Sequence, residues 1–183
     1  MNIIQQNLNV NMIRESLENI PECALPPDFQ LKWYSPGDER HWVVIHQQAE
    51  KFFETNLDLY QREFDADQAT LNERQCFLFD KSGQAIGTAT AWYNNDYYGQ
   101  YFGRIHWVAI IPQMQGKGLS KPLMTAVCKR LRQLGHQQAY LVTSTGRIPA
   151  INLYLKFGFL PDIRNEQDQF IWHAFQEFLE KEQ

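Results

Sequence analysis

The segment spanning residues 105–122 constrains the fold more than any other part of this 183-residue chain. It opens with an apolar run, residues 105–111, that is interrupted only by His106 and is rich in β-branched and aromatic side chains. Such a run is typical of a strand that is covered on both faces. Pro112 ends the strand, because proline has no N–H to donate to a β-ladder. The segment therefore predicts a buried strand followed at once by a turn.

An amphipathic helix is predicted directly after this turn, over residues 118–134. Apolar side chains recur at steps of three and four residues from Leu119 to Leu134, which places them on one helix face. Pro122 fits the first helical turn, where its missing N–H would have no intrahelical partner. Gly135 follows at a position where helices often end in a glycine cap.

The turn between strand and helix has the features of an anion-binding site. Gly116 and Gly118 let the backbone approach a ligand closely, and a helix N-terminus offers unpaired N–H groups. Lys117 and Lys121 add positive charge, so a phosphate or pyrophosphate suits the turn. An ordinary tight turn is the alternative on these residues alone, and neither a P-loop nor a Rossmann glycine motif is present.

Two motifs resemble those of the GNAT superfamily of N-acetyltransferases, and they follow one another in the same order as in that family. The first matches the family pattern Arg/Gln-x-x-Gly-x-Gly/Ala, with serine at the last position as its one departure, and reads Gln115-Gly-Lys-Gly118-Leu-Ser120. The second lies downstream and reads Ala150-Ile-Asn-Leu153-Tyr154-Leu-Lys-Phe-Gly158-Phe159. The resemblance covers residues 29–160 and implies an enzyme that binds acetyl-CoA and acetylates an amine.

The predicted fold is α/β, with a mixed, mostly antiparallel central sheet flanked by helices. Strands are expected over residues 29–34, 75–80, 85–93, 104–111 and 138–143, and further helices over residues 39–53 and 57–64. Residues 94–100 are expected to form a loop, and residues 149–160 a helix, a turn and a strand. Residues 1–27 are expected to be a poorly ordered arm, and residues 28–183 a single domain. Helical spacing after residue 167 predicts a C-terminal helix where the family usually has a last strand.

The resemblance assigns acetyl-CoA binding to the strand end, to the glycine turn and to one residue before Tyr154. The residues are Val108, Ile110, Gln115, Gly116, Lys117, Gly118, Leu119, Ser120 and Asn152. A backbone N–H of Val108 or Ile110, exposed at a bulge, would polarise the thioester carbonyl. Asn152 could contact the pantetheine amides or simply face solvent.

Tyr154 and His106 are the candidate catalytic residues. By resemblance Tyr154 protonates the departing thiolate, although an aromatic residue on an apolar helix is more often part of the core. His106 is the candidate base, because it is the one ionisable side chain inside the apolar run, and strand alternation predicts that it shares a face with Val108 and Ile110. A structural histidine, with water as the base, is the alternative. Some family members carry a glutamate where this chain has Arg104, which cannot act as a base at neutral pH.

Composition narrows the class of partner. A net charge of −4 argues against binding to nucleic acid through phosphate neutralisation. The chain has no apolar segment long enough to span a membrane, and its odd number of cysteines, three, is typical of free thiols in the cytoplasm. The five histidines lack metal-ligand spacing, so no metal is expected. A homodimer is compatible with the sequence.

Three functional hypotheses remain open at this point. The first is direct acetyl transfer from acetyl-CoA to a small-molecule or peptide amine, without a covalent enzyme intermediate, because no cysteine lies in the motifs. The second is a non-catalytic acyl-CoA-binding sensor or interaction module, and the third an enzyme for longer acyl groups. The acceptor pocket is expected near the first two helices and residues 94–100, lined by aromatic side chains drawn from Trp33, Trp42, Tyr60, Tyr97, Tyr98 and Tyr101, with Glu54, Asp58 or Asp96 facing a cation.

Overall fold

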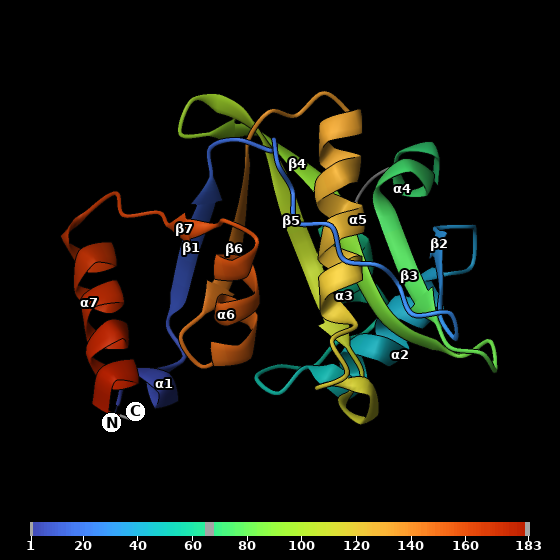
Figure 1. Ribbon diagram of the computed structural model, residues 1–183, viewed down its shortest axis with the longest axis horizontal. Helices are drawn as coiled ribbons and strands as arrows, with labels where there is room; N and C mark the ends of the chain where they lie inside the picture. The colour runs from blue at the N-terminus through green and yellow to red at the C-terminus, as the bar shows by residue number, and fades with distance from the viewer. Residues whose placement is uncertain (1, 65–67, 182–183) are drawn as a thin grey trace.

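The computed structural model describes residues 2–64 and 68–181, which form one sheet with helices on both faces (Figure 1). The strand order in these residues is β2-β3-β4-β5-β6-β1-β7. The strands are Asn9–Arg14 (β1), Gln30–Trp33 (β2), Gln75–Phe79 (β3), Ala85–Tyr97 (β4), Gln100–Ile110 (β5), Ala139–Ser144 (β6) and Leu160–Pro161 (β7). β5 and β6 are parallel and the other neighbouring pairs antiparallel, which confirms the predicted mixed sheet.

The helices also follow the predicted order, with two short helices that were not predicted, one at the N-terminus and one just before β3. They are Ile3–Gln6 (α1), Glu39–Ala49 (α2), Leu57–Glu63 (α3), Gln68–Arg74 (α4), Ser120–Gln133 (α5), Ile148–Lys156 (α6) and Glu166–Lys181 (α7), with a short 3-10 helix at Pro112–Met114 (η1). The C-terminal helix predicted from apolar spacing is present as α7. Pro112 follows β5 directly, as expected from its missing N–H.

Helices α3 and α5 cover opposite faces of the sheet. His106 of β5 meets the ring of Phe64, which directly follows α3, with ring centroids 5.5 Å apart. A Cβ built on Gly103 of the same strand would lie 3.1 Å from Leu131 of α5. Because residues three apart in a regular strand point to opposite faces, the two helices lie on different sides. In Figure 1, α5 and α6 lie in front of the sheet, and α2 and α3 behind it.

The expectation of a poorly ordered N-terminal arm is wrong, because the arm supplies an interior strand. β1 pairs antiparallel with β6 along its whole length and with β7 on its other edge, between the two in Figure 1. Val10 and Met12 alternate with more exposed neighbours, and both are buried. Leu17 then donates its backbone N–H to the Gln137 carbonyl at 2.7 Å, and Cys23 donates its own to Thr125 Oγ1 at 3.2 Å. The N-terminal residues are therefore part of the sheet and its core.

Two predicted boundaries differ in ways that matter for the site. Residues 94–100 are a tight hairpin rather than a loop, because Tyr98 and Gly99 adopt φ values of 52° and 78° that suit a two-residue turn. Helix α2 ends at Ala49, earlier than predicted, so Phe52 and Phe53 lie in the connection to α3 and not on the helix. No helix among the described residues is long and apolar enough to cross a membrane.

Candidate active site

A bulge in β5 shapes the centre of the candidate site. Trp107 has a φ of 50°, a left-handed value that is rare for a large side chain. Thr88 and Thr90 are two residues apart on β4, whereas their partners on β5, Ala109 and His106, are three apart. The extra residue breaks the alternation of side chains along β5. His106 consequently shares its face with Ala109.

The prediction that the His106 side chain shares a face of β5 with that of Ile110 is therefore wrong. Ile110 follows Ala109 in the regular part of the strand and points to the opposite face from His106, while Val108 lies within the bulge. The prediction assumed an uninterrupted period of two, and a bulge leaves no trace in apolar periodicity. The bulge does fall where the resemblance places it, beside Val108.

β5 and β6 separate beside the bulge. The two strands pair only from Gly103 to Ile105 on β5 and from Ala139 to Leu141 on β6. Beyond Ile105, no strand of the described residues pairs with this edge of β5. The edge past the bulge can therefore offer backbone N–H and C=O groups to a ligand.

The glycine turn lies at the far end of this gap. Gly116 and Gly118 both have a φ of 76°, and a Cβ built on either would meet nothing within 4 Å, so the backbone is open. Gln115 donates its side-chain amide to the Ile110 carbonyl at 2.8 Å, which ties the turn to the end of β5. Helix α5 starts at Ser120, two residues later than predicted, and Pro122 lies in its first turn as expected. The turn thus presents N–H groups at a helix N-terminus.

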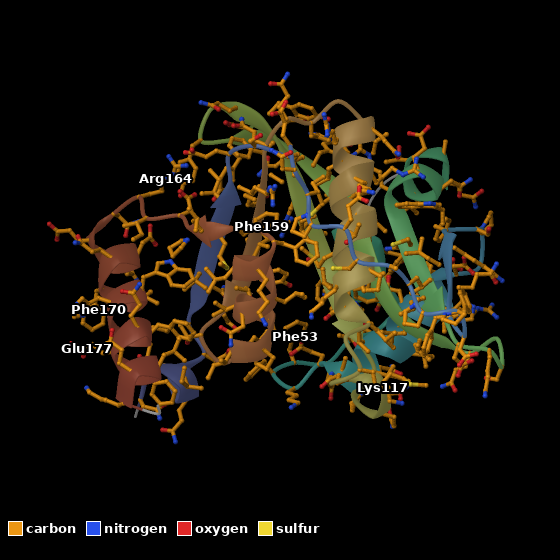
Figure 2. The ribbon with its side chains drawn as sticks, in the orientation of Figure 1. Phe53, Lys117, Phe159, Arg164, Phe170 and Glu177 are labelled. Atoms are coloured by element: carbon orange, nitrogen blue, oxygen red, sulfur yellow. The ribbon has the colours of Figure 1, made fainter. Side chains whose placement is uncertain are left out.

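A cavity of about 580 Å³ joins the gap between β5 and β6 to the glycine turn. All of the predicted site residues line it except Lys117 and Asn152. Asn152 is exposed on α6, and Lys117 is exposed with Nζ 3.2 Å from Met114 Sδ. Figure 2 shows Lys117 at the tip of the turn and Phe53, which does line the cavity, at the same end of the molecule.

Tyr154 reaches the cavity from α6. It is buried, and among the described residues its hydroxyl has no hydrogen-bond partner, although its ring meets Phe159 with centroids 6.4 Å apart. Burial raises the pKa of Tyr154 to about 12. The hydroxyl therefore keeps its proton at neutral pH and is free to donate it into the cavity.

His106 belongs to a buried polar cluster that the sequence did not indicate. Its Nε2 lies 3.1 Å from Glu63 Oε2, and the Trp107 indole N–H donates to the same oxygen at 3.0 Å. Burial lowers the pKa of His106 to about 4, although Glu63 opposes the shift. The pKa of Glu63 falls to about 2, chiefly through its interaction with His106. At neutral pH the cluster is a neutral imidazole beside a carboxylate.

Comparison with known proteins identifies the family. The profile of the acetyltransferase (GNAT) family matches residues 17–159, a range that contains the glycine turn, the bulge and Tyr154. The chain belongs to the GNAT family. The match begins after β1, so the strand order of this GNAT domain includes a segment that lies outside the matched range.

Curated relatives of this GNAT domain are named as mycothiol acetyltransferases. The protein of Saccharomonospora viridis is 31% identical over 153 residues, which cover 76% of this chain and 48% of that protein. The protein of Pseudarthrobacter chlorophenolicus is 30% identical over 152 residues, covering 77% and 45%. The chain therefore spans about half the length of the curated relatives it matches.

Solved structures share the fold of this GNAT domain. The GCN5-related N-acetyltransferase from Sphaerobacter thermophilus has a TM-score of 0.70 at 18% identity, covering 84% of this chain and 48% of that one. The ribosomal-protein-S18-alanine N-acetyltransferase from Escherichia coli has a TM-score of 0.58 at 17% identity, covering 75% and 97%. At these identities the likeness concerns the arrangement of helices and strands.

The wall of the cavity next to His106 comes from α2 and the residues after it. His46 of α2 is buried, its Nε2 has no hydrogen-bond partner among the described residues, and its ring lies 4.9 Å from the ring of Trp107. Burial lowers the pKa of His46 to about 3. His46 stands four residues after Trp42 on the buried face of α2, and this polar residue on an apolar face is the signal that sequence reasoning missed.

None of the residues predicted to line the acceptor pocket of this GNAT domain lines the cavity. Trp42 and Tyr60 are core residues, and Tyr97 lies in a separate small cluster at the other end of β4. Phe52 and Phe53 lie at the cavity instead, together with Glu50, which accepts two hydrogen bonds from Arg147 Nη2 at 2.8 and 2.7 Å. The pair joins the C-terminal cap of α2 to the loop before α6.

Proposed function

We propose that this GNAT domain is an N-acetyltransferase that moves an acetyl group from acetyl-CoA directly to an amine. One observation carries the proposal: a single cavity connects the glycine turn, the open edge of β5, Tyr154 and His106. An anion site and a backbone edge can bind acetyl-CoA and polarise its thioester, and a proton donor and a neutral imidazole can assist the attack of an amine.

The cavity fits acetyl-CoA at both ends. The open backbone at Gly116 and Gly118, at the start of α5, would bind the diphosphate, with Leu119 and Ser120 completing the turn. The edge of β5 at Val108 and Ile110 would hold the pantetheine arm and polarise the thioester carbonyl through a backbone N–H. Acetyl-CoA supplies the activated acetyl group, and the protein holds, orients and exchanges protons around it.

The proton transfers fall to two side chains on different elements. The amine nitrogen forms a bond to the carbonyl carbon, and the carbon–sulfur bond breaks. Tyr154 protonates the departing sulfur, a role supported by its unpartnered, protonated hydroxyl. His106, neutral beside Glu63, accepts the proton that the amine loses, directly or through water.

Direct transfer is further supported by the cysteines. Cys76 and Cys128 are buried, and burial raises the pKa of both thiols to about 12, so neither is a ready nucleophile. Neither they nor Cys23 line the cavity. The three free thiols also support our proposal that the protein works in the cytoplasm.

The test measures binding and turnover in the same sample. The melting temperature is recorded with acetyl-CoA, CoA and longer acyl-CoAs, and thiol release is then followed with a panel of amines that includes the precursor amine of mycothiol. We expect stabilisation by acetyl-CoA and thiol release that depends on the amine. Binding without release for every amine would favour a sensor, and no binding would contradict the proposal.

A matched pair of glycine variants makes the test specific. Gly116→Ala and Gly83→Ala each place a Cβ at a positive φ with open space around it, so both carry similar backbone strain. Only Gly116 lies at the cavity. We expect Gly116→Ala to weaken acetyl-CoA binding about tenfold, and Gly83→Ala to leave it within about twofold of the wild type, because strain alone acts on stability.

A further inference from the structure

Arg104 places a positive charge on the side of the cavity that carries His106. The two residues are separated by one position on β5, before the bulge, where pairing with β4 is regular, so their side chains share a face. Arg104 lines the cavity, as do His106 and Glu63. Its charge contributes to lowering the pKa of both His106 and Glu63, so it lies within electrostatic reach of the candidate base.

The charge of Arg104 is not neutralised within the described residues. Its Nε is buried without a hydrogen-bond partner, and no carboxylate forms an ion pair with its guanidinium. The two cavity carboxylates are already engaged, Glu50 with Arg147 and Glu63 with the imidazole and indole beside it. The closest aromatic contact, with the Tyr140 ring, has a guanidinium-to-centroid distance of 5.8 Å. A half-buried cation in this setting favours an anionic ligand.

The phosphates of acetyl-CoA are in the wrong place to be that anion. Arg104 precedes the last residue of β5, Ile110, by six positions, and the glycine turn lies beyond it. At about 3.3 Å per residue, the end of β5 is ~20 Å from Arg104 along the strand, and the phosphate site lies past that end. Arg104 also lies where β5 and β6 are still paired, at the closed end of the gap. The anion must therefore enter with the second substrate.

We propose that Arg104 binds a carboxylate of the acceptor, so that the enzyme acetylates amines that carry a carboxylate a few bonds from the nitrogen. This inference rests on the proposed function and names its substrate class. Arg104 and His106 are ~7 Å apart along the strand, which suits an amine at the imidazole and a carboxylate at the guanidinium of one small molecule. The guanidinium can bind a carboxylate with two parallel hydrogen bonds, and it repels acceptors with a second ammonium group.

The test compares acceptors that differ only in the carboxylate. Phenylalanine with phenethylamine, and histidine with histamine, are assayed at pH values that give equal fractions of neutral amine. We expect the wild type to prefer the carboxylated member of each pair at least tenfold in kcat/KM. Arg104→Gln should reduce this preference to within about threefold. Arg104→Lys should retain part of the preference, because the lysine ammonium still attracts a carboxylate as a point charge. Arg132→Gln, an exposed arginine of α5 outside the cavity, should keep the wild-type preference.

A binding measurement separates this inference from the proposed function. Calorimetry in the presence of CoA compares N-acetylphenylalanine with N-acetylphenethylamine, which requires no turnover. We expect the wild type to bind N-acetylphenylalanine at least tenfold more tightly than N-acetylphenethylamine. The Arg104→Gln variant should bind the two products equally. Absence of thiol release with every amine would overturn the proposed function alone if this binding difference persists. Equal binding of the two products to the wild type, or a preference that Arg104→Gln retains, would overturn the role of Arg104.

Discussion

The Nε2 atom of His106 lies 3.1 Å from Glu63 Oε2, which joins the central strand to the last residue of α3. The carboxylate also accepts the indole N–H of Trp107, the residue whose left-handed φ marks the bulge. The strained part of β5 is thus fixed by a side chain from a distant helix, and the imidazole is held at the edge of the cavity.

Glu63→Gln should make His106 a weaker base and lower its pKa. Glu63 opposes the effect of burial on His106, so the pKa of His106 should fall further without the carboxylate, and the acid limb of kcat should move to lower pH. We expect kcat at pH 7 to fall about tenfold, the usual scale of a weakened general base. The measurement is a pH–rate profile, with exposed Glu73→Gln as the control. An unmoved acid limb would show that His106 is not the titrating base.

Tyr154→Phe should slow turnover without weakening the binding of acetyl-CoA. Removing the proton donor for the thiolate should lower kcat by about 10²-fold, since general acid catalysis is worth that much. The ring remains, so the affinity for acetyl-CoA, measured by calorimetry, should change little. Tyr101→Phe is the matched control, because Tyr101 is exposed and lies outside the cavity. A kcat equal to that of the wild type at every pH would assign Tyr154 to the core instead.

Mild acid should destabilise the protein through its buried imidazoles. Burial lowers the pKa of His46 to about 3 and that of His106 to about 4. Below pH 6.5 the unfolded chain therefore binds more protons than the folded protein does. The stabilising contribution of these neutral imidazoles is therefore fully present above pH 6.5 and is lost toward pH 4, by about 3 kcal/mol for each of the two. Buried His136 acts in the same direction.

Urea unfolding at pH 7 and pH 4.5 checks this dependence. His46→Phe should lessen the loss of stability between the two pH values, because one of the depressed imidazoles is removed. His173→Gln, on the exposed face of α7, should leave the loss as it is in the wild type. Equal losses in the wild type and in His46→Phe would contradict the burial of a neutral His46.

Met12→Ala should destabilise the whole domain, although it lies outside the range matched to the family. Met12 is fully buried in β1 between β6 and β7, and truncating such a side chain costs about 3 kcal/mol through lost burial and a cavity. Glu15→Ala, exposed just after β1, is the control. Denaturant unfolding gives the free energies, and a loss below about 1 kcal/mol would mean that β1 adds little to the core.

The sequence predicted most of the helices and strands, and one end of the site, because the signals are local. Proline, glycine and apolar spacing within a few residues determine where β5 ends, how the turn at Gly116 and Gly118 bends, and where α5 begins. The same spacing predicted α7, and the motif around Tyr154 predicted a residue that reaches the cavity.

Only the tertiary structure decided what surrounds that turn. β1 enters the sheet through pairing with β6, more than a hundred residues away, and its polar, asparagine-rich sequence gives no local sign of that partner. The bulge at Trp107 reverses the side assigned to His106, since an inserted residue alters the register without changing which residues are apolar. Glu63, His46 and Arg104 meet at the cavity from two helices and a strand. Local periodicity determines which face of an element is buried, whereas the residues that meet across elements depend on non-local packing and register.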